Sequence, residues 1–128
     1  MFQHKIFYMI IPLFLLLIGC SKVSDEELRV AHDAFNKGAL LIDVRTKEEF
    51  KEKHANKAVN IPVQLLERYY KYLPKDKEII VYCQTGSRSH IAAEFLEKKG
   101  RKVYDVKTQE DWERELLPSS NKLVNTSD

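Results

Sequence analysis

Short, continuously apolar runs alternate along the chain with segments whose apolar side chains recur at helical spacing. Strands are expected over 39–42, 59–62, 78–82 and 102–106. The run 39–42 has no polar position, which is typical of a parallel strand covered on both faces. The proline at the end of 59–62 closes that strand.

The intervening segments carry helix signals. Ser24 with Glu27, and Thr46 with Glu49, have the spacing of capping boxes, and Gly38 and Gly100 are helix stops. The core-facing side chains expected on successive helices are Leu28, Ala31 and Phe35; Phe50; Leu65, Tyr69 and Tyr72; Ile91, Ala92, Phe95 and Leu96; and Trp112 and Leu116.

Strands that alternate with helices predict an α/β fold, with a small, mostly parallel sheet and helices on both faces. The domain is expected to span residues 25–117. Residues 20–24 are a short tether, and residues 118–128, which have little to bury, are a mobile tail.

The N-terminal stretch has the features of an export signal. Residues 6–18 are apolar, Lys5 precedes them, and no acidic residue occurs before Asp25. The stretch is short for a transmembrane helix. It ends in Leu17-Ile18-Gly19-Cys20, which resembles the lipobox of bacterial lipoproteins, and the resemblance implies cleavage after residue 19 and acylation of Cys20. An ordinary cleaved signal and a short uncleaved anchor are the alternatives.

Cysteine count and charge narrow the chemistry. Cys20 and Cys83 are the two cysteines, so a lipidated Cys20 leaves Cys83 as the one thiol of the mature chain, without an intramolecular disulfide. Lys5 is the one charged residue in the leader, which leaves 20 of the 21 basic residues against 19 acidic ones. A balance this close to neutral gives no support for a nucleic-acid partner.

Cys83 lies where the strand 78–82 passes into a helix. Backbone N–H groups of Gln84 to Arg88 can converge there, and the positive end of the helix dipole adds to their effect. A thiolate would be stabilised in this position, so Cys83 is a candidate nucleophile. A buried structural cysteine is the alternative, but a core cysteine needs neither Gly86 nor Arg88 nearby.

Polar residues also follow the strand 39–42, where Asp43 and Arg45 occur. Ligand sites in parallel sheets gather beyond the carboxyl ends of the strands, so both residues are candidates for the rim of the same site. No histidine is placed as an obvious base for Cys83, and His54 is interpreted as a structural hydrogen-bonding residue. The four histidines have no metal-ligand spacing, and no metal or other cofactor is expected.

Several motifs together resemble the single-domain rhodaneses, a family of sulfurtransferases. They occur in the family's order and cover almost the whole predicted domain: Leu41-Ile42-Asp43-Val44-Arg45, Glu48-Glu49-Phe50, His54, Ala58-Val59-Asn60-Ile61-Pro62, and Val81-Tyr82-Cys83 to Gly86-Ser87-Arg88-Ser89. The resemblance implies that Cys83 carries a persulfide cradled by Gln84, Thr85, Gly86, Ser87 and Arg88, while Asp43 and Arg45 orient or charge the rim.

The implied reaction is a double displacement. Cys83 takes a sulfur from thiosulfate or a similar small anionic donor and passes it to cyanide or a thiol. Arg88 holds the loop, the donor, or both. The sequence departs from the family pattern at two places that bear on substrate choice. Lys53 and Lys57 lie on either side of His54 where the family has glycine, and Lys107-Thr108 replaces a Gly-Gly pair.

Other functions stay open at this point. Phosphatases and arsenate reductases on the same scaffold have one more residue between cysteine and arginine than the four found here, which favours sulfur. A non-catalytic membrane-tethered binding domain and a redox sensor are further alternatives. The lipobox places the chain in a bacterial cell envelope, facing the periplasm or the exterior, and the oligomeric state cannot be read from the sequence.

Overall fold

The computed structural model describes residues 22–116, so the predictions on the leader 1–19, on Cys20 and on the tail 118–128 lie outside the described residues. In chain order the elements are α1 (Asp25–Asn36), β1 (Leu40–Asp43), α2 (Lys47–Glu52), β2 (Val59–Asn60), η1 (Val63–Leu65), α3 (Leu66–Tyr69), η2 (Tyr70–Tyr72), β3 (Ile79–Cys83), α4 (Ser87–Lys98), β4 (Val103–Thr108) and α5 (Gln109–Glu113).

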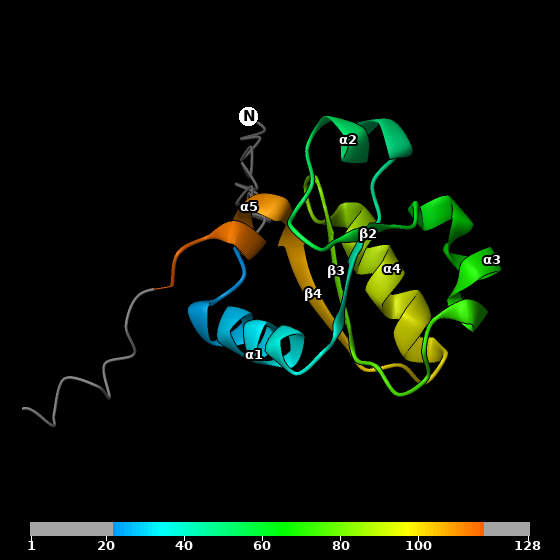
Figure 1. Ribbon diagram of the computed structural model, residues 1–128, viewed down its shortest axis with the longest axis horizontal. Coiled ribbons are helices and arrows are strands. Elements are labelled where there is room, and N and C mark those ends of the chain that lie inside the picture. Colours follow the sequence, from blue (N-terminus) through cyan, green and yellow to red (C-terminus); the bar gives the residue numbers. More distant parts are fainter. Residues whose placement is uncertain (1–21, 117–128) are drawn as a thin grey trace, which may run out of the picture.

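The four strands form one parallel sheet in the order β2-β1-β3-β4. Helices α1 and α5 lie on one side of it, and α3 and α4 lie on the other (Figure 1). The predicted α/β class, the parallel sheet and the two helical layers are confirmed. Each predicted strand is present, with ends displaced by one or two residues.

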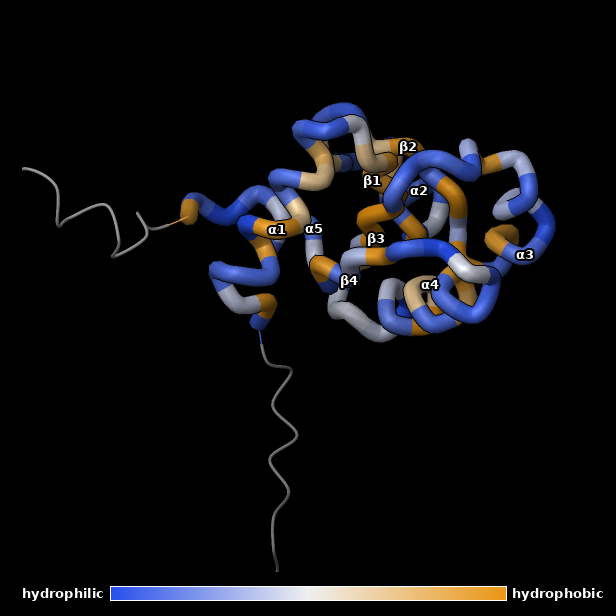
Figure 2. The backbone as a smooth tube through the Cα atoms, turned by 90° about the horizontal axis from the view of Figure 1, so that it is seen from below, coloured by the Kyte–Doolittle hydropathy of each residue, from blue (hydrophilic) through white to orange (hydrophobic). Residues whose placement is uncertain are grey.

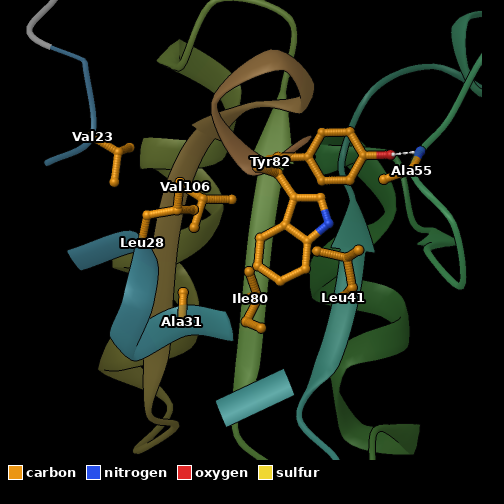
Figure 3. Close-up of a cluster of buried hydrophobic side chains, with 9 residues drawn as sticks. Val23, Leu28, Ala31, Leu41, Ala55, Ile80, Tyr82 and Val106 are labelled. Carbon is orange, nitrogen blue, oxygen red and sulfur yellow. Dashed lines mark hydrogen bonds between the residues drawn. The ribbon is translucent and has the colours of Figure 1, made fainter. Parts of the chain in front are cut away.

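The side chains of β3 alternate between two cores. Ile80 and Tyr82 face the layer of α1, where they meet Leu28 of α1 and Val106 of β4 (Figure 3). Trp112 of α5 belongs to the same core. The tube of Figure 2 is orange along β3, as expected of a strand buried on both faces.

The second core lies between the sheet and α4. Ile79, Val81 and Cys83 of β3 point into it and meet Ala92 and Leu96 of α4. Cys83 therefore belongs to a buried apolar layer and lies at the sheet's carboxyl edge, two features that position the site described below.

Capping residues explain where two helices begin. The side chains of Ser24 and Thr46 accept hydrogen bonds from the backbone N–H groups of Glu27 and Glu49, and both glutamates bond back to their caps. Both predicted capping boxes are confirmed. Each satisfies backbone donors that the first helical turn leaves without a partner.

The predicted inward face of the third helix is wrong. Leu65 and Tyr69 are 41% exposed and Tyr72 is 73% exposed, whereas Leu66 is 2% exposed. Tyr70 and Leu73 pack against the core beside Leu66. The segment consists of a short α-helical turn between two 3-10 turns, and the spacing 66, 70, 73 is as helical as the one predicted. On α4, Ile91 is likewise exposed, and Ala93 is buried in addition to Ala92 and Leu96.

The N-terminal entry into the fold is packed. Val23, which lies in the predicted tether, is 4% exposed and belongs to the core under α1. The folded part of the chain therefore includes residue 23. Among residues 22–116, no helix is long and apolar enough to cross a membrane.

Candidate active site

Cys83 ends the central strand and lies under the N-terminus of α4. The residue is 1% exposed, and the backbone N–H of Gly86 donates a hydrogen bond to its Sγ at 3.1 Å. The sequence predicts several backbone N–H donors at the sulfur, and the N–H of Gly86 is one of them. The convergence of the other N–H groups of Gln84 to Arg88 stays a prediction.

Gly86 has a backbone conformation that requires glycine. Its φ is 97°, and a Cβ at this position would lie 3.3 Å from the Cβ of Lys107. A side chain would therefore be disfavoured both by the backbone conformation and by crowding. The loop can turn back over the sulfur because residue 86 is glycine.

The fully buried Ser89 ties this loop to β4. Its Oγ lies 3.1 Å from the carbonyl oxygen of Gly86 and 3.3 Å from that of Lys107, so the hydroxyl donates to either acceptor. Gly86 contacts the sulfur through its N–H. Ser89 thus holds the carbonyl group of Gly86, the residue whose N–H donates to the sulfur.

Helix α4 directs its N-terminus at the loop. It has 12 residues and starts at Ser87, next to the Gly86 N-cap. The partial positive charge of a helix N-terminus favours an anion such as a thiolate within the first turn. Thr85 and Ser87, two of the predicted binding residues, are exposed there with their hydroxyl oxygens 3.4 Å apart.

Arg88 pairs with Glu49 of α2. Its Nη1 donates to Oε2 at 2.7 Å and its Nη2 donates to Oε1 at 2.9 Å. Hydrogen bonding from Arg88, and then from the backbone of Thr46, lowers the pKa of Glu49 to about 2. The same pair raises the pKa of Arg88, with a further contribution from the charge of Cys83. Arg88 therefore joins the cysteine loop to α2.

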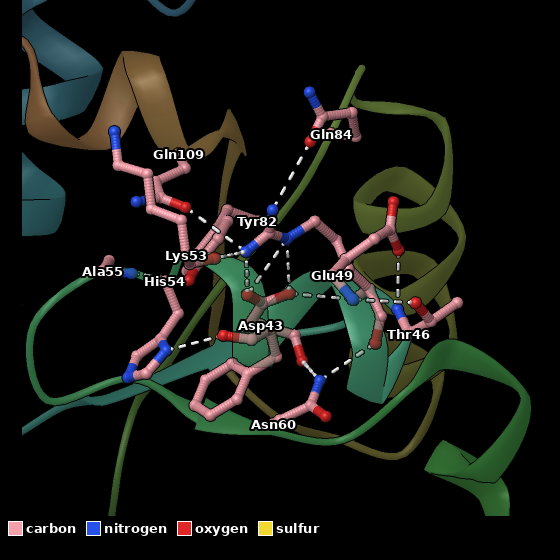
Figure 4. Close-up of polar contacts among 12 residues, drawn as sticks. Asp43, Thr46, Glu49, Lys53, His54, Ala55, Asn60, Tyr82, Gln84 and Gln109 are labelled. Carbon is pink, nitrogen blue, oxygen red and sulfur yellow. Dashed lines mark hydrogen bonds and ion pairs between the residues drawn. The ribbon is translucent and has the colours of Figure 1, made fainter.

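Asp43 and Arg45 form a second, buried pair at the carboxyl end of β1. Asp43 is fully buried, and Arg45 Nη2 donates to its Oδ2 at 2.6 Å. The same nitrogen donates to the carbonyl of Lys53 and to the side chain of Gln109, and Nη1 reaches the Gln84 side chain at 3.4 Å (Figure 4). The pair thus braces β1 against α2, α5 and the cysteine loop.

Tyr82 supports this network from below. Its ring lies under the Arg45 guanidinium, with 5.5 Å from the ring centre to Cζ, and its hydroxyl accepts a hydrogen bond from the Ala55 N–H at 3.0 Å (Figure 4). Burial raises the pKa of Tyr82 above its ordinary value, so the hydroxyl stays protonated.

Cys83 opens into a cleft of about 810 Å³ between α2 and α5. Arg45 and Gln84 line the cleft beside the sulfur, together with residues of both helices and of the N-terminal entry. The lining residues are Lys22, Arg45, Glu49, Glu52, Lys53, Cys83, Gln84, Thr108, Gln109, Glu110, Asp111, Glu113 and Arg114. The cleft therefore presents the thiol together with charges of both signs.

Two lysines adopt the left-handed backbone conformation. Lys57 and Lys107 both have φ of 63°, the region that favours glycine. They stand at two positions where the family was expected to have glycine. Lys107 lies where β4 has an extra residue relative to β3, between the pairs Val81↔Asp105 and Cys83↔Thr108. This conformational demand explains why glycine suits these positions.

The structure gives His54 a structural environment. Its ring stacks on Phe50 with 3.7 Å between ring centres, and Nδ1 lies 2.7 Å from the Phe50 carbonyl oxygen. Within residues 22–116, no group of three or more His, Cys, Asp or Glu side chains is arranged to hold a metal ion.

Three supporting residues were not identified as site residues from the sequence. Glu49 was expected only as a helix cap, and Gln109 and Ser89 had no assigned role. Their contacts join segments 39, 64 and 18 positions apart, and such distances depend on the sheet order. The motif Glu48-Glu49-Phe50 was the one signal in the sequence that pointed toward Glu49.

The chain is similar in sequence and structure to known proteins. A family model described as a rhodanese-like domain matches residues 27–123 of the chain. Over 76 residues, or 59% of the chain, the sequence is 31% identical to a protein named sulfurtransferase from Allochromatium vinosum, and the match covers 71% of that protein.

Two further matches extend the comparison. The chain is 46% identical over 70 residues, or 53% of its length, to a probable molybdopterin-synthase adenylyltransferase from Porphyra purpurea, but the match spans only 18% of that longer protein. A solved rhodanese-related protein from Thermoplasma volcanium superposes with a TM-score of 0.59 at 29% identity, covering 71% of this chain and 88% of the other.

Proposed function

Because the chain belongs to the rhodanese-like family, we propose that it is a sulfurtransferase in which Cys83 carries the transferred sulfur as a persulfide. The observation that carries the proposal is the placement of Cys83, whose Sγ accepts a hydrogen bond from Gly86 at the N-terminus of α4 and which lines the cleft between α2 and α5. A thiolate and a persulfide are both anionic, so one environment stabilises both forms.

The proposed donor is thiosulfate or a similar sulfane compound. The Cys83 thiolate attacks the outer sulfur, a new S–S bond forms, and the S–S bond of thiosulfate breaks. Sulfite leaves with the electron pair of the broken bond. Neither an external oxidant nor a metal takes part, since the two sulfur atoms of the donor supply the redox balance.

The proposed acceptor is cyanide or a thiolate. It attacks the terminal sulfur of the persulfide, takes that atom, and returns the bonding electrons to Cys83 as a thiolate. The cleft of about 810 Å³ leaves room for an acceptor larger than cyanide.

Arg88 is assigned to holding the loop. Both of its terminal nitrogens bond to Glu49, so its charge is already balanced by a carboxylate. Asp43 and Arg45 are likewise assigned a structural role. Asp43 is fully buried, and Arg45 donates its hydrogen bonds to residues of β1, α2 and α5. Gln84 and the backbone of residues 84–88 remain the groups proposed to contact the donor.

The test is mass spectrometry of the reduced protein after exposure to thiosulfate. We expect a gain of one sulfur atom on Cys83 and none in Cys83→Ser. A subsequent incubation with cyanide or a thiol should remove the added sulfur. A folded, reduced protein that gains no sulfur, or that hydrolyses phosphate esters instead, would overturn the proposal.

We also propose that Cys20 is acylated and holds the chain on a membrane of a bacterial cell envelope. The support is the sequence Leu17-Ile18-Gly19-Cys20 after an apolar stretch. Several acyl chains anchor a protein stably, whereas one does not. Membrane fractionation tests this: Cys20→Ala should release the protein, and continued membrane retention of that variant would contradict acylation.

A further inference from the structure

The cleft that contains the thiol also contains the beginning of the described chain. Lys22 lines the cleft together with Cys83 and Gln84. In Figure 1 the first described residues rise beside α5, which forms one wall of the cleft. Any segment that precedes residue 22 therefore leaves the fold from the wall of the candidate active site.

This exit point is held in place. Arg114, which follows α5, donates from Nη2 to the carbonyl oxygen of Val23 at 2.7 Å and to Asp25 at 3.0 Å. Its Nη1 donates to Asp111 of α5 at 2.8 Å. Val23 itself is buried in the core. The entry segment is consequently part of the rigid fold and does not swing away from the cleft.

The length of chain between the lipobox cysteine and this fixed point is short. Three residue steps separate Cys20 from Val23, and an extended chain advances about 3.3–3.6 Å per residue, so the tether reaches about 10 Å. A domain of this size is about 30 Å across. A tether of that length cannot bring the far side of the domain to the anchor.

We propose that the cleft around Cys83 opens against the membrane surface that holds the chain, so that sulfur donors and acceptors reach the thiol from that surface. The inference rests on the acylation of Cys20 proposed above. The interacting face is the rim formed by Lys22, Lys53 and Glu110, and its partner is the lipid surface.

The tether, rather than charge, sets this orientation. The cleft is lined by four basic residues, Lys22, Arg45, Lys53 and Arg114, and by five acidic residues, Glu49, Glu52, Glu110, Asp111 and Glu113. These charges nearly balance, so their attraction to an anionic lipid surface is small. Raising the salt concentration, which screens such attraction, should leave the orientation unchanged.

The experiment uses the full chain, purified from membranes with its lipid anchor and reconstituted into phosphatidylcholine and phosphatidylglycerol vesicles. In a Cys83→Ser background, a fluorophore is attached at the rim through Glu110→Cys or Lys53→Cys. Matched labels at Lys75→Cys or Asp76→Cys mark the loop before β3, at the opposite edge of the sheet. Head-group nitroxide lipids then quench whichever labels lie near the membrane.

We expect the rim labels to be quenched at least twofold more than the loop labels, in low and in high salt. A 20-residue Gly-Ser linker inserted after Ser21 should remove the difference. Equal quenching with the native tether, or stronger quenching of the loop labels, would overturn the orientation. The two rim labels should be quenched to the same extent, and so should the two loop labels. A single substitution that perturbs the fold would break this agreement.

The outcomes separate the two proposals. Vesicle flotation reports the anchor, and a full chain that does not float overturns both the acylation and the orientation. Sulfur loading of Cys83 is measured on the wild-type chain in detergent, where no membrane is present. It therefore succeeds or fails independently of the quenching result.

Discussion

Arg88 and Glu49 meet in a two-point ion pair, with Nη1 to Oε2 at 2.7 Å and Nη2 to Oε1 at 2.9 Å, and this contact joins the loop of Cys83 to α2. Arg88, which follows Cys83 by five positions, is thus already paired with a carboxylate of the protein. Glu49 serves twice, since its carboxylate also accepts from the N–H of Thr46 at the start of α2.

Glu49→Gln should therefore weaken both the fold and the reaction. An amide keeps the shape but cannot form a charged pair, and the two side chains are only about 30% exposed (27% and 32%). We expect a loss of about 1 kcal/mol in the free energy of unfolding and slower sulfur loading of Cys83. Urea denaturation and single-turnover mass spectrometry measure these effects. Glu48→Gln, an exposed neighbour in α2, is the control and should change neither.

The stabilisation from Glu49 should disappear in acid. Its pKa is about 2 in the folded protein against an ordinary value of 4.5, so the unfolded chain binds the proton more readily. The contribution is complete above about pH 5 and is lost as the pH falls toward the folded pKa. The difference in unfolding free energy between wild type and Glu49→Gln should be constant from neutral pH to about pH 5 and shrink below it. A difference that grows in acid would contradict the assignment.

Tyr82→Phe should destabilise the protein without touching the reacting atoms. The substitution leaves the buried N–H of Ala55 without the hydroxyl oxygen that now accepts its hydrogen bond at 3.0 Å. An unsatisfied buried donor costs about 1–3 kcal/mol, and we expect about 2 kcal/mol in urea denaturation. Tyr72→Phe is the matched control, because Tyr72 is 73% exposed and its loss should stay within about 0.5 kcal/mol.

Lys57→Gly is expected to stabilise the fold. Lysine at φ of 63° carries a cost of about 1–2 kcal/mol that glycine avoids, and the flexibility of glycine in the unfolded chain offsets part of the gain. A net stabilisation of about 0.5 kcal/mol should appear as a higher urea midpoint. Lys51→Gly, in the interior of α2, should have the opposite sign and cost about 1 kcal/mol. Equal effects at both positions would refute the conformational argument.

Ser89→Ala tests whether the loop geometry controls the thiol. The hydroxyl holds the carbonyl of Gly86, whose N–H contacts the sulfur. We expect about 1 kcal/mol of destabilisation and a lower rate of Cys83 alkylation by iodoacetamide at fixed pH. Ser24→Ala, which removes the cap of α1, should cost a similar stability. If both variants slow alkylation equally, the effect is one of stability and Ser89 has no positioning role.

The local features of this fold could be predicted because they depend on neighbouring residues. The capping boxes of Ser24 and Thr46 and the apolar strand around Ile80 each arise within a few positions, and the structure contains all of them. Cys83 could be placed beside a helix N-terminus for the same reason. Its strand and its helix are adjacent in the chain.

Features that depend on the order of the strands could not be read from the sequence. The pairing of Arg88 with Glu49, and of Arg45 with Gln109, follows from placing β1 beside β3 and α5 above them. The inward face of residues 63–73 was mispredicted because two apolar spacings, one through Leu65 and one through Leu66, satisfy the same helical period. Packing against Ile42 and Leu96 selects the second.

The clamp of Arg114 on Val23 joins residues 91 positions apart. The polypeptide consequently enters and leaves the domain at one corner, and neither end has to cross the sheet. Such an arrangement suits a cassette that is fused to, or inserted into, other proteins with little added linker. In the Porphyra purpurea relative, the stretch that matches this chain is 18% of the protein.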